Sequence, residues 1–169
     1  IRRQRQMCIR DRGLVEHFGG SLGVLDYPMH GKPSPIRRLF DDTGTHLSGT
    51  LDPADRDQFI IHSGAQVKFD ILRDLPSEFQ VARYHSLYGQ KHSFPSVLVP
   101  TAITLDGVVM ALQHRSLPIA AVQFHPESIL TLPKYGMKII SNALRELKSD
   151  HYDLSVGSDS LTSQPIRIV

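Results

Sequence analysis

The sequence contains few of the residues that mark secreted or membrane proteins. It has one cysteine, Cys8, no tryptophan, and no apolar run that approaches the roughly 18 residues of a membrane-spanning helix. A single cysteine excludes an internal disulfide framework and fits a reducing compartment, and no secretory signal is recognisable. We therefore expect a cytoplasmic protein without a membrane partner.

Positive charge is concentrated at one end of the chain. The first twelve of the 169 residues hold five arginines against one acid, Asp11, so the remaining residues carry a net charge of −2. Binding to nucleic acid needs a basic face with aromatic side chains that stack on bases, and the body of the chain offers neither. We expect no nucleic-acid partner, and the 40% hydrophobic content predicts one globular domain with a substantial core.

Short apolar segments alternate with polar turns along the chain. Asp106-Gly107, between two apolar runs, is typical of a tight hairpin turn. Residues 13–20 predict a helix that ends at glycines. Six apolar runs predict strands, at 22–25, 36–40, 79–84, 97–105, 108–114 and 119–124. Residues 133–148 predict a closing helix with an apolar stripe made of Met137, Ile140, Ala143, Leu144 and Leu147.

The predicted strand at 119–124 delivers a histidine and a carboxylate, His125 and Glu127, at its end. A histidine that takes and returns protons near pH 7 needs a partner that fixes its tautomer and stabilises its charged form, and a nearby glutamate does both. The matching nucleophile is Cys8, which precedes the helix predicted at 13–20. The N–H groups at the start of a helix stabilise a thiolate, the reactive form.

Four separated motifs carry a family resemblance. They are GLVEHFGG at 13–20, MHGKPS at 29–34, RYHSL at 83–87 and AVQFHPES at 121–128. In this order they resemble a class I glutamine amidotransferase domain, and they are most similar to the amidotransferase half of anthranilate synthase in the form that carries both halves in one chain. The similarity covers residues 13–148.

The resemblance implies a fold and a catalytic triad. The fold is of the α/β class, an open and mostly parallel sheet with helices on both faces, here without its first strands. The triad consists of Cys8 as nucleophile, His125 as base and then acid, and Glu127 as the residue that orients the histidine. The thiolate attacks the side-chain amide of glutamine, and a glutamyl thioester is then hydrolysed.

The resemblance also implies a substrate site and a partner. Ser86 and Leu87 line the glutamine site through backbone groups, and His30 and Lys32 face the partner in a loop. That partner is a chorismate-using synthase domain or subunit, which receives ammonia and makes anthranilate for tryptophan biosynthesis. The amidotransferase domain itself needs no cofactor or metal, because the expected magnesium ion belongs to the synthase.

The residues around Cys8 depart from the family pattern. That pattern is Gly-x-Cys-x-Gly followed by glutamine, but Gln6 and Arg10 stand in place of the glycines and Arg12 in place of the glutamine. Such an elbow strains its backbone by about 1–3 kcal/mol per residue and places a donor of the oxyanion hole. Because these features are altered, and the family's earlier strands do not precede them, we expect little or no glutaminase activity from this polypeptide alone.

Three explanations of residues 1–12 stay open. The segment is a divergent terminus, a basic binding arm, or non-native sequence joined to a truncated domain. We favour the third, because the segment resembles translated sequencing-adapter sequence and ends where family-like sequence begins. We expect residues 13–148 to be the C-terminal part of the amidotransferase domain, residues 44–70 to be an inserted loop with a short strand at 59–61, and residues 149–169 to be a tail.

Three other functions compete with this interpretation. A zinc deaminase also uses His-x-Glu, but no cysteine follows His125 to complete a metal shell, which argues against a metal site. The amidotransferase of aminodeoxychorismate synthase, in the folate pathway, would use the same chemistry. A catalytically dead module that docks on a synthase would keep the fold and lack the activity.

Overall fold

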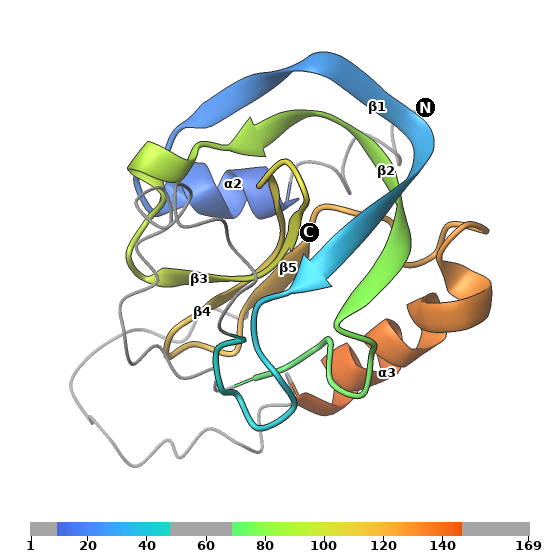
Figure 1. Cartoon of the computed structure of the whole chain (residues 1–169). Coiled ribbons are helices and arrows are strands. Elements are labelled where there is room, and N and C mark those ends of the chain that lie inside the picture. The colour runs from blue at the N-terminus through green and yellow to red at the C-terminus, as the bar shows by residue number, and fades with distance from the viewer. Residues whose placement is uncertain (1–9, 48–68, 147–169) are drawn as a thin grey trace, which may run out of the picture.

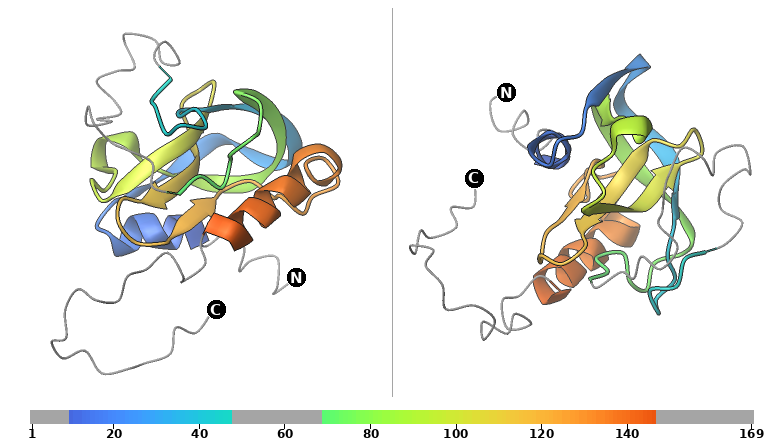
Figure 2. Two further views of the ribbon diagram at one scale, coloured as in Figure 1. Left: turned by 90° about the horizontal axis from the view of Figure 1, so that it is seen from below. Right: turned by 90° about the vertical axis from the view of Figure 1, so that its left-hand side faces the viewer.

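The computed structural model describes residues 10–47 and 69–146. Its described strands form one sheet in the order β2-β1-β3-β4-β5, which curls strongly so that β1 and β2 arch away from the other three (Figures 1 and 2). The strands are β1 (Leu22–Arg38), β2 (Glu78–Gly89), β3 (Leu98–Thr104), β4 (Val109–His114) and β5 (Ala120–Val122).

The strand directions differ from the expected mostly parallel sheet. Helices and strands together confirm the α/β class, but every pairing between described strands is antiparallel. Strands β3 and β4 follow each other too closely for the crossover of a dozen or more residues that parallel neighbours need. The chain instead reverses at the predicted Asp106-Gly107 turn, where Gly107 has a φ of 76° and donates its N–H to Thr104.

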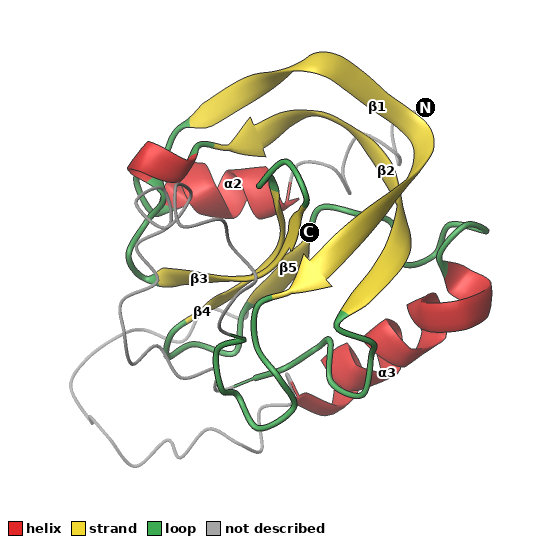
Figure 3. Ribbon diagram, viewed as in Figure 1, coloured by secondary structure: helices red, strands yellow, loops and turns green. Residues whose placement is uncertain are grey.

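Strand β1 joins two segments that the sequence predicts as separate strands. Three prolines, Pro28, Pro33 and Pro35, lie inside it, and proline is normally confined to strands with an open edge because it cannot donate to a ladder. Here β1 pairs with β2 from Leu22 to Arg37, whereas it pairs with β3 only from Ile36 to Arg38. The prolines are therefore tolerated, and β1 is continuous in Figure 3.

Helices α2 (Arg10–His17) and α3 (Met137–Glu146) pack into different apolar clusters. Val15 of α2 belongs to a cluster with Val109 of β4, whereas Ile139 of α3 belongs to a cluster with Met110. Adjacent residues of a strand point to opposite faces of a sheet, so the two helices cover opposite faces of β4. Two short helical segments complete the described structure, η2 (Lys91–Ser93) and η3 (Leu132–Gly136).

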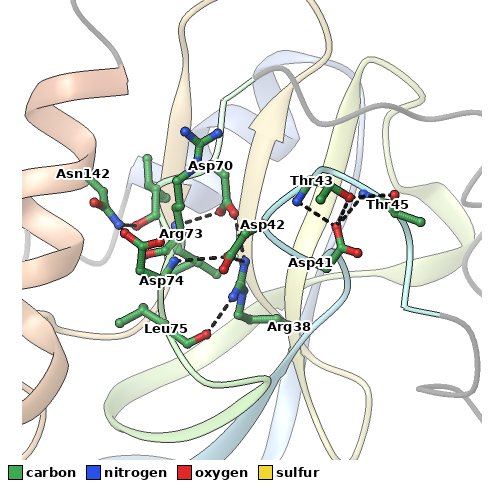
Figure 4. Close-up of polar contacts among 12 residues, drawn as sticks. Arg38, Asp41, Asp42, Thr43, Thr45, Asp70, Arg73, Asp74, Leu75 and Asn142 are labelled. Atoms are coloured by element: carbon green, nitrogen blue, oxygen red, sulfur yellow. Dashed lines mark hydrogen bonds and ion pairs between the residues drawn. The ribbon is translucent and has the colours of Figure 1, made fainter.

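The predicted apolar stripe of α3 is wrong. Met137 and Leu144 are exposed, and the buried face of the helix carries Ile139 and Asn142. The rotation has a polar cause, because the Asn142 amide donates to the carbonyls of Ile71 and Arg73, at 3.2 and 2.8 Å. Figure 4 shows this contact between α3 and the segment that precedes β2.

The end of β1 is joined to the same segment by a buried ion cluster. Arg38 donates to Asp42 at 2.7 Å, to Asp70 at 2.9 Å and to the Leu75 carbonyl at 2.7 Å (Figure 4). Arg38 and Asp42 precede the expected insertion, whereas Asp70 is its last residue and Leu75 follows it, so the two ends of the insertion are held together. The strand predicted at 59–61 and the expected tail at 149–169 lie outside the described residues.

Candidate active site

His125 lies just after β5, where backbone contacts fix its position. Its N–H donates to the Ala82 carbonyl of β2 at 3.1 Å, and its own carbonyl accepts from the Ser128 N–H at 3.1 Å. The side-chain Nδ1 is 2.7 Å from Oε1 of Glu127. The histidine side chain is 12% exposed and the glutamate 45%, so a mostly buried ring meets a carboxylate at the surface.

This contact decides the tautomer of His125. A carboxylate only accepts hydrogen bonds, so Nδ1 carries the proton and the lone pair is on Nε2. An imidazole in this state accepts a proton at Nε2, and the carboxylate then stabilises the imidazolium that forms. The pair can therefore act as a general base and then as a general acid.

Tyr84 connects His125 with β1. Its ring meets the imidazole edge to face, with 4.9 Å between centroids and 74° between planes. Gly31 of β1 also lies close to Tyr84, since an added Cβ would be 3.3 Å from the tyrosine ring. Gly31 is an extra residue in the β1–β2 register and has a φ of 62°, a bulge of the kind found beside active sites.

The residues expected to face a partner flank this bulge. His30 and Lys32 are both exposed, on either side of Gly31. They lie inside strand β1 instead of the predicted loop, because the pairing with β2 continues through Tyr84 and Arg83. His30 and Lys32 are thus the neighbours in sequence of Gly31, the residue that lies close to the Tyr84 ring, and Tyr84 contacts His125.

Ser86 and Leu87, the residues expected at the glutamine site, lie on β2. A second irregularity in β1 is opposite them, where residues 25–28 face Ser86 alone. The Leu87 carbonyl accepts two side-chain hydrogen bonds, from Nδ1 of His85 and from Nε2 of Gln123, both at 3.0 Å. Gln123 is two residues before His125, so the segment that donates to this carbonyl also carries His125 and Glu127.

The polar side chains around the Leu87 carbonyl were not predicted from the sequence. His85 receives a hydrogen bond at Nε2 from Nε of Arg83 at 3.0 Å, and both side chains are buried. Burial, and then the Arg83 charge, lower the pKa of His85 to about 4. Their spacing could have revealed them. Alternate residues of a strand point to the same face, so Arg83 and His85 share the buried face of Val81.

Helix α2 is the described element that follows the expected nucleophile in the sequence. Cys8 lies outside the described residues, and α2 begins at Arg10, three residues before the boundary expected at Gly13. Asp11 is buried, and burial raises its pKa to about 6 against the opposing effects of Arg12 and of the Gln123 amide. Its Oδ1 is buried without a hydrogen-bond partner among the described residues.

Two properties of the described residues bear on other classes of site. They hold no group of three histidine, cysteine or acidic side chains that could bind a metal ion. None of the helices in the described ranges is long and apolar enough to cross a membrane.

The sequence matches a known family of enzymes. A family model described as glutamine amidotransferase class-I matches residues 8–147. The match covers most of the chain, so the chain belongs to the class-I glutamine amidotransferase family, as the four motifs indicate. It begins at the position of Cys8 and includes His125 and Glu127.

Curated relatives within this family are anthranilate synthases. The chain is 39% identical over 142 residues to the anthranilate synthase of Azospirillum brasilense. The matched segment covers 83% of this chain and 16% of that protein. It is 38% identical over 138 residues to anthranilate synthase component 2 of the same organism, covering 82% and 55%. Component 2 of Halobacterium salinarum is 36% identical over 139 residues, covering 82% and 54%. The chain thus spans little more than half the length of these component 2 proteins.

A solved structure shares the fold. A protein of Thermoplasma acidophilum that is named for GMP synthase matches with a TM-score of 0.56 and 24% identity, over 80% of this chain and 52% of that one. At this identity the likeness concerns the fold alone.

Proposed function

We propose that these residues are part of the glutamine amidotransferase of an anthranilate synthase. The names of the relatives support this assignment, since anthranilate synthases match over four fifths of the chain. The single structural observation that carries it is the 2.7 Å contact between Nδ1 of His125 and Oε1 of Glu127. The reaction is the hydrolysis of glutamine to glutamate and ammonia.

In the proposed reaction each residue of the triad has one role. His125 takes the thiol proton of Cys8 at Nε2, and the resulting thiolate attacks the side-chain carbonyl carbon of glutamine. The C–N bond then breaks as His125 gives that proton to the departing ammonia. His125 then takes a proton from water, which attacks the thioester and releases glutamate. Glu127 holds the histidine ring and stabilises its charged form in both steps.

The proposed partner is a synthase that uses ammonia and chorismate to make anthranilate. His30 and Lys32 are the proposed contacts, because they are exposed basic residues at the bulge that supports Tyr84 and, through it, His125. No cofactor is proposed for the amidotransferase part, and the expected magnesium ion would belong to the synthase. A free catalytic thiol is preserved in a reducing compartment, so we propose that the reaction takes place in the cytoplasm.

Alkylation of Cys8 tests the proposed triad directly. Because Cys8 is the one cysteine of the chain, mass spectrometry reports its modification without ambiguity. Little turnover is expected, because the residues around Cys8 depart from the family pattern, but a single alkylation needs no turnover. We expect a glutamine-analogue electrophile to label Cys8 faster at pH 7 than iodoacetamide does, and His125→Asn to slow labelling by about 10²-fold or more, the usual contribution of a general base. Cys8→Ser provides the blank, and equal rates for wild type and His125→Asn would contradict the proposal.

The product identifies the pathway. The protein is mixed with an anthranilate synthase component that lacks its own amidotransferase, and anthranilate is measured by its fluorescence with glutamine or with ammonium as the nitrogen source. Glutamine-dependent anthranilate supports the proposal. The same assay is run in parallel with an aminodeoxychorismate synthase component that lacks its own amidotransferase, and glutamine-dependent synthesis with that component alone would identify the folate enzyme. Ammonium-dependent synthesis alone, together with co-purification of the protein and the synthase component, would identify a docking module without activity.

A further inference from the structure

We infer that Arg83, His85 and Gln123 are positioning residues of the glutamine site, which fix the Leu87 carbonyl and with it the backbone of Ser86 and Leu87. This inference rests on the proposed function, because it concerns the site where glutamine would bind. It assigns a role to buried polar groups that the hydrolysis itself does not use.

The Leu87 carbonyl is held from two sides. Nδ1 of His85 approaches from the same strand, and Nε2 of Gln123 approaches from the segment after β5, both at 3.0 Å. A carbonyl oxygen has two lone pairs, so both are used by the protein. The peptide plane that follows Leu87 is therefore fixed before any substrate arrives, and a site that is already ordered binds with a smaller loss of entropy.

Arg83 determines which nitrogen of His85 donates. A guanidinium only donates hydrogen bonds, so Nε2 of His85 must accept the bond from Arg83, and the proton must be on Nδ1, which faces the Leu87 carbonyl. Arg83 is only 4% exposed, and a buried charge costs several kcal/mol unless other interactions offset it. A buried arginine whose Nε donates to a neutral ring is a costly arrangement, which favours a role in the site over a role in stability alone.

The neutral state of His85 is favoured from several elements. Burial lowers the pKa of His85 most, followed by the charge of Arg83 on β2, and the charge of Arg12 on α2 acts in the same direction. The hydrogen bond to the Leu87 carbonyl and the charge of Asp106 in the β3–β4 turn oppose them. A protonated His85 would direct Nε2–H at the Nε–H of Arg83, so two donors and two positive charges would face each other. The arrangement around Leu87 is therefore intact near pH 7 and broken in acid.

Two isosteric variants separate the two hydrogen bonds of His85. In His85→Asn the amide nitrogen takes the place of Nδ1 and can donate to Leu87, but Arg83 loses its acceptor. In His85→Gln the side-chain amide takes the place of Nε2 and can accept from Arg83, but the donor to Leu87 is lost. Both variants disturb the buried cluster, so a purely structural role predicts similar effects of the two.

The test is a glutamine titration of the full chain at pH 7, followed by the NMR shifts of the Ser86 and Leu87 amides. We expect the Kd for glutamine to rise about tenfold in His85→Gln, the effect of one buried hydrogen bond, and to stay within about twofold of wild type in His85→Asn. Thermal unfolding of both variants is measured alongside, to compare their stabilities.

Each outcome has one meaning. Equal Kd values for wild type and His85→Gln, or equal losses in both variants, would overturn the positioning role while leaving the proposed function in place. Absence of any glutamine-dependent shift in wild type would overturn the proposed function and this inference with it.

Two measurements replace the His85→Gln result if that variant does not fold. Gln123→Met removes the other donor to Leu87 at nearly constant volume, and we expect a similar rise in Kd. In wild type, the affinity for glutamine should fall as the pH drops from 6.5 toward 4, and His85→Asn should lack this fall. An affinity in wild type that does not change over this range, together with unaltered binding by Gln123→Met, would overturn the inference.

Discussion

Helices α2 and α3 each bury one polar side chain, and only one of the two side chains is fully hydrogen-bonded. Asn142 of α3 is inaccessible to solvent, donates to the carbonyls of Ile71 and Arg73, and accepts from Arg145 at 3.1 Å. Asp11 of α2 is also buried, but its Oδ1 has no hydrogen-bond partner in the described part of the chain. The contrast shows where the sequence is adapted to its fold and where it is not.

The magnitudes explain the state of Asp11. A carboxylate in the first turn of a helix gains about 0.3–1 kcal/mol from the helix dipole. Its pKa is nevertheless raised from 3.8 to about 6, which corresponds to a cost of about 3 kcal/mol for the charged form. Burial therefore outweighs the dipole, and the poorly accommodated residue is in the 10–12 segment that departs from the family pattern.

The largest expected effect is on α3. Asn142→Ala removes two donors and leaves the Ile71 carbonyl buried without a partner, so we expect a loss of about 4 kcal/mol in the free energy of unfolding. Urea denaturation measures this loss. Ser141→Ala, at an exposed position of the same helix, should change stability by less than about 0.5 kcal/mol, and a loss for Asn142→Ala as small as this would remove the contrast between the helices.

His85 sharpens the comparison, because it is hydrogen-bonded like Asn142 and titratable like Asp11. Above pH 6.5 its ring is neutral in both the folded and unfolded chain. As the pH falls toward 4, His85 is protonated in the unfolded chain but stays largely neutral in the folded chain, because its pKa in the folded chain is about 4. We expect wild type to lose about 3 kcal/mol over this range through His85.

The control for this acid loss is a variant that does not titrate at position 85. Unfolding free energies of wild type and His85→Asn are measured by urea denaturation at several pH values, and their difference isolates the contribution of His85. Equal slopes for the two proteins between pH 6.5 and 4 would contradict the assignment of this loss to His85.

The fold was partly predictable from the sequence, where local chemistry decides the structure. The Asp106-Gly107 turn was predicted because glycine accepts the positive φ that the turn requires, and the observed φ of Gly107 is 76°. The continuity of β1 was missed, because the tolerance of its prolines depends on an edge that only the assembled sheet reveals. The rotation of α3 depends on carbonyls at Ile71 and Arg73, about seventy residues away in sequence.

The candidate site shows the same division. His125 and Glu127 were predicted as a pair, since they are two residues apart after an apolar strand, and they are 2.7 Å apart. The contacts among Arg83, His85 and Gln123 were missed, because they depend on how β2 lies against the segment after β5. No local pattern specifies that two distant side chains will share the Leu87 carbonyl.

Asp11→Asn should remove the destabilising buried charge of helix α2. Below pH 3.8 the carboxyl is protonated in the folded and unfolded chain, whereas above pH 6 the folded chain holds a buried charge. The variant is expected to gain about 2 kcal/mol at pH 8 and nothing near pH 4, because the asparagine amide is still buried but no longer ionises. Urea denaturation at the two pH values measures the gain, and equal stability of wild type and variant at pH 8 would show that Asp11 is accommodated.

The smallest expected effects concern two glycines, one at each side of the site. Gly31 has a φ of 62° and is close to the Tyr84 ring, whereas Gly13 of α2 has nothing within 4 Å of an added Cβ. We expect Gly31→Ala to cost about 1 kcal/mol and Gly13→Ala to add about 0.5–1 kcal/mol, since alanine is strained in the left-handed region and favoured in a helix.

The same pair of variants tests whether the two sides differ in function as well as in stability. An alanine at position 31 would displace Tyr84, whose ring contacts His125, so Gly31→Ala should also slow the alkylation of Cys8. Gly13→Ala is the matched control, because it adds the same methyl group where there is room for it. A slower reaction in both variants, or in neither, would mean that the bulge at Gly31 does not support the catalytic histidine through Tyr84.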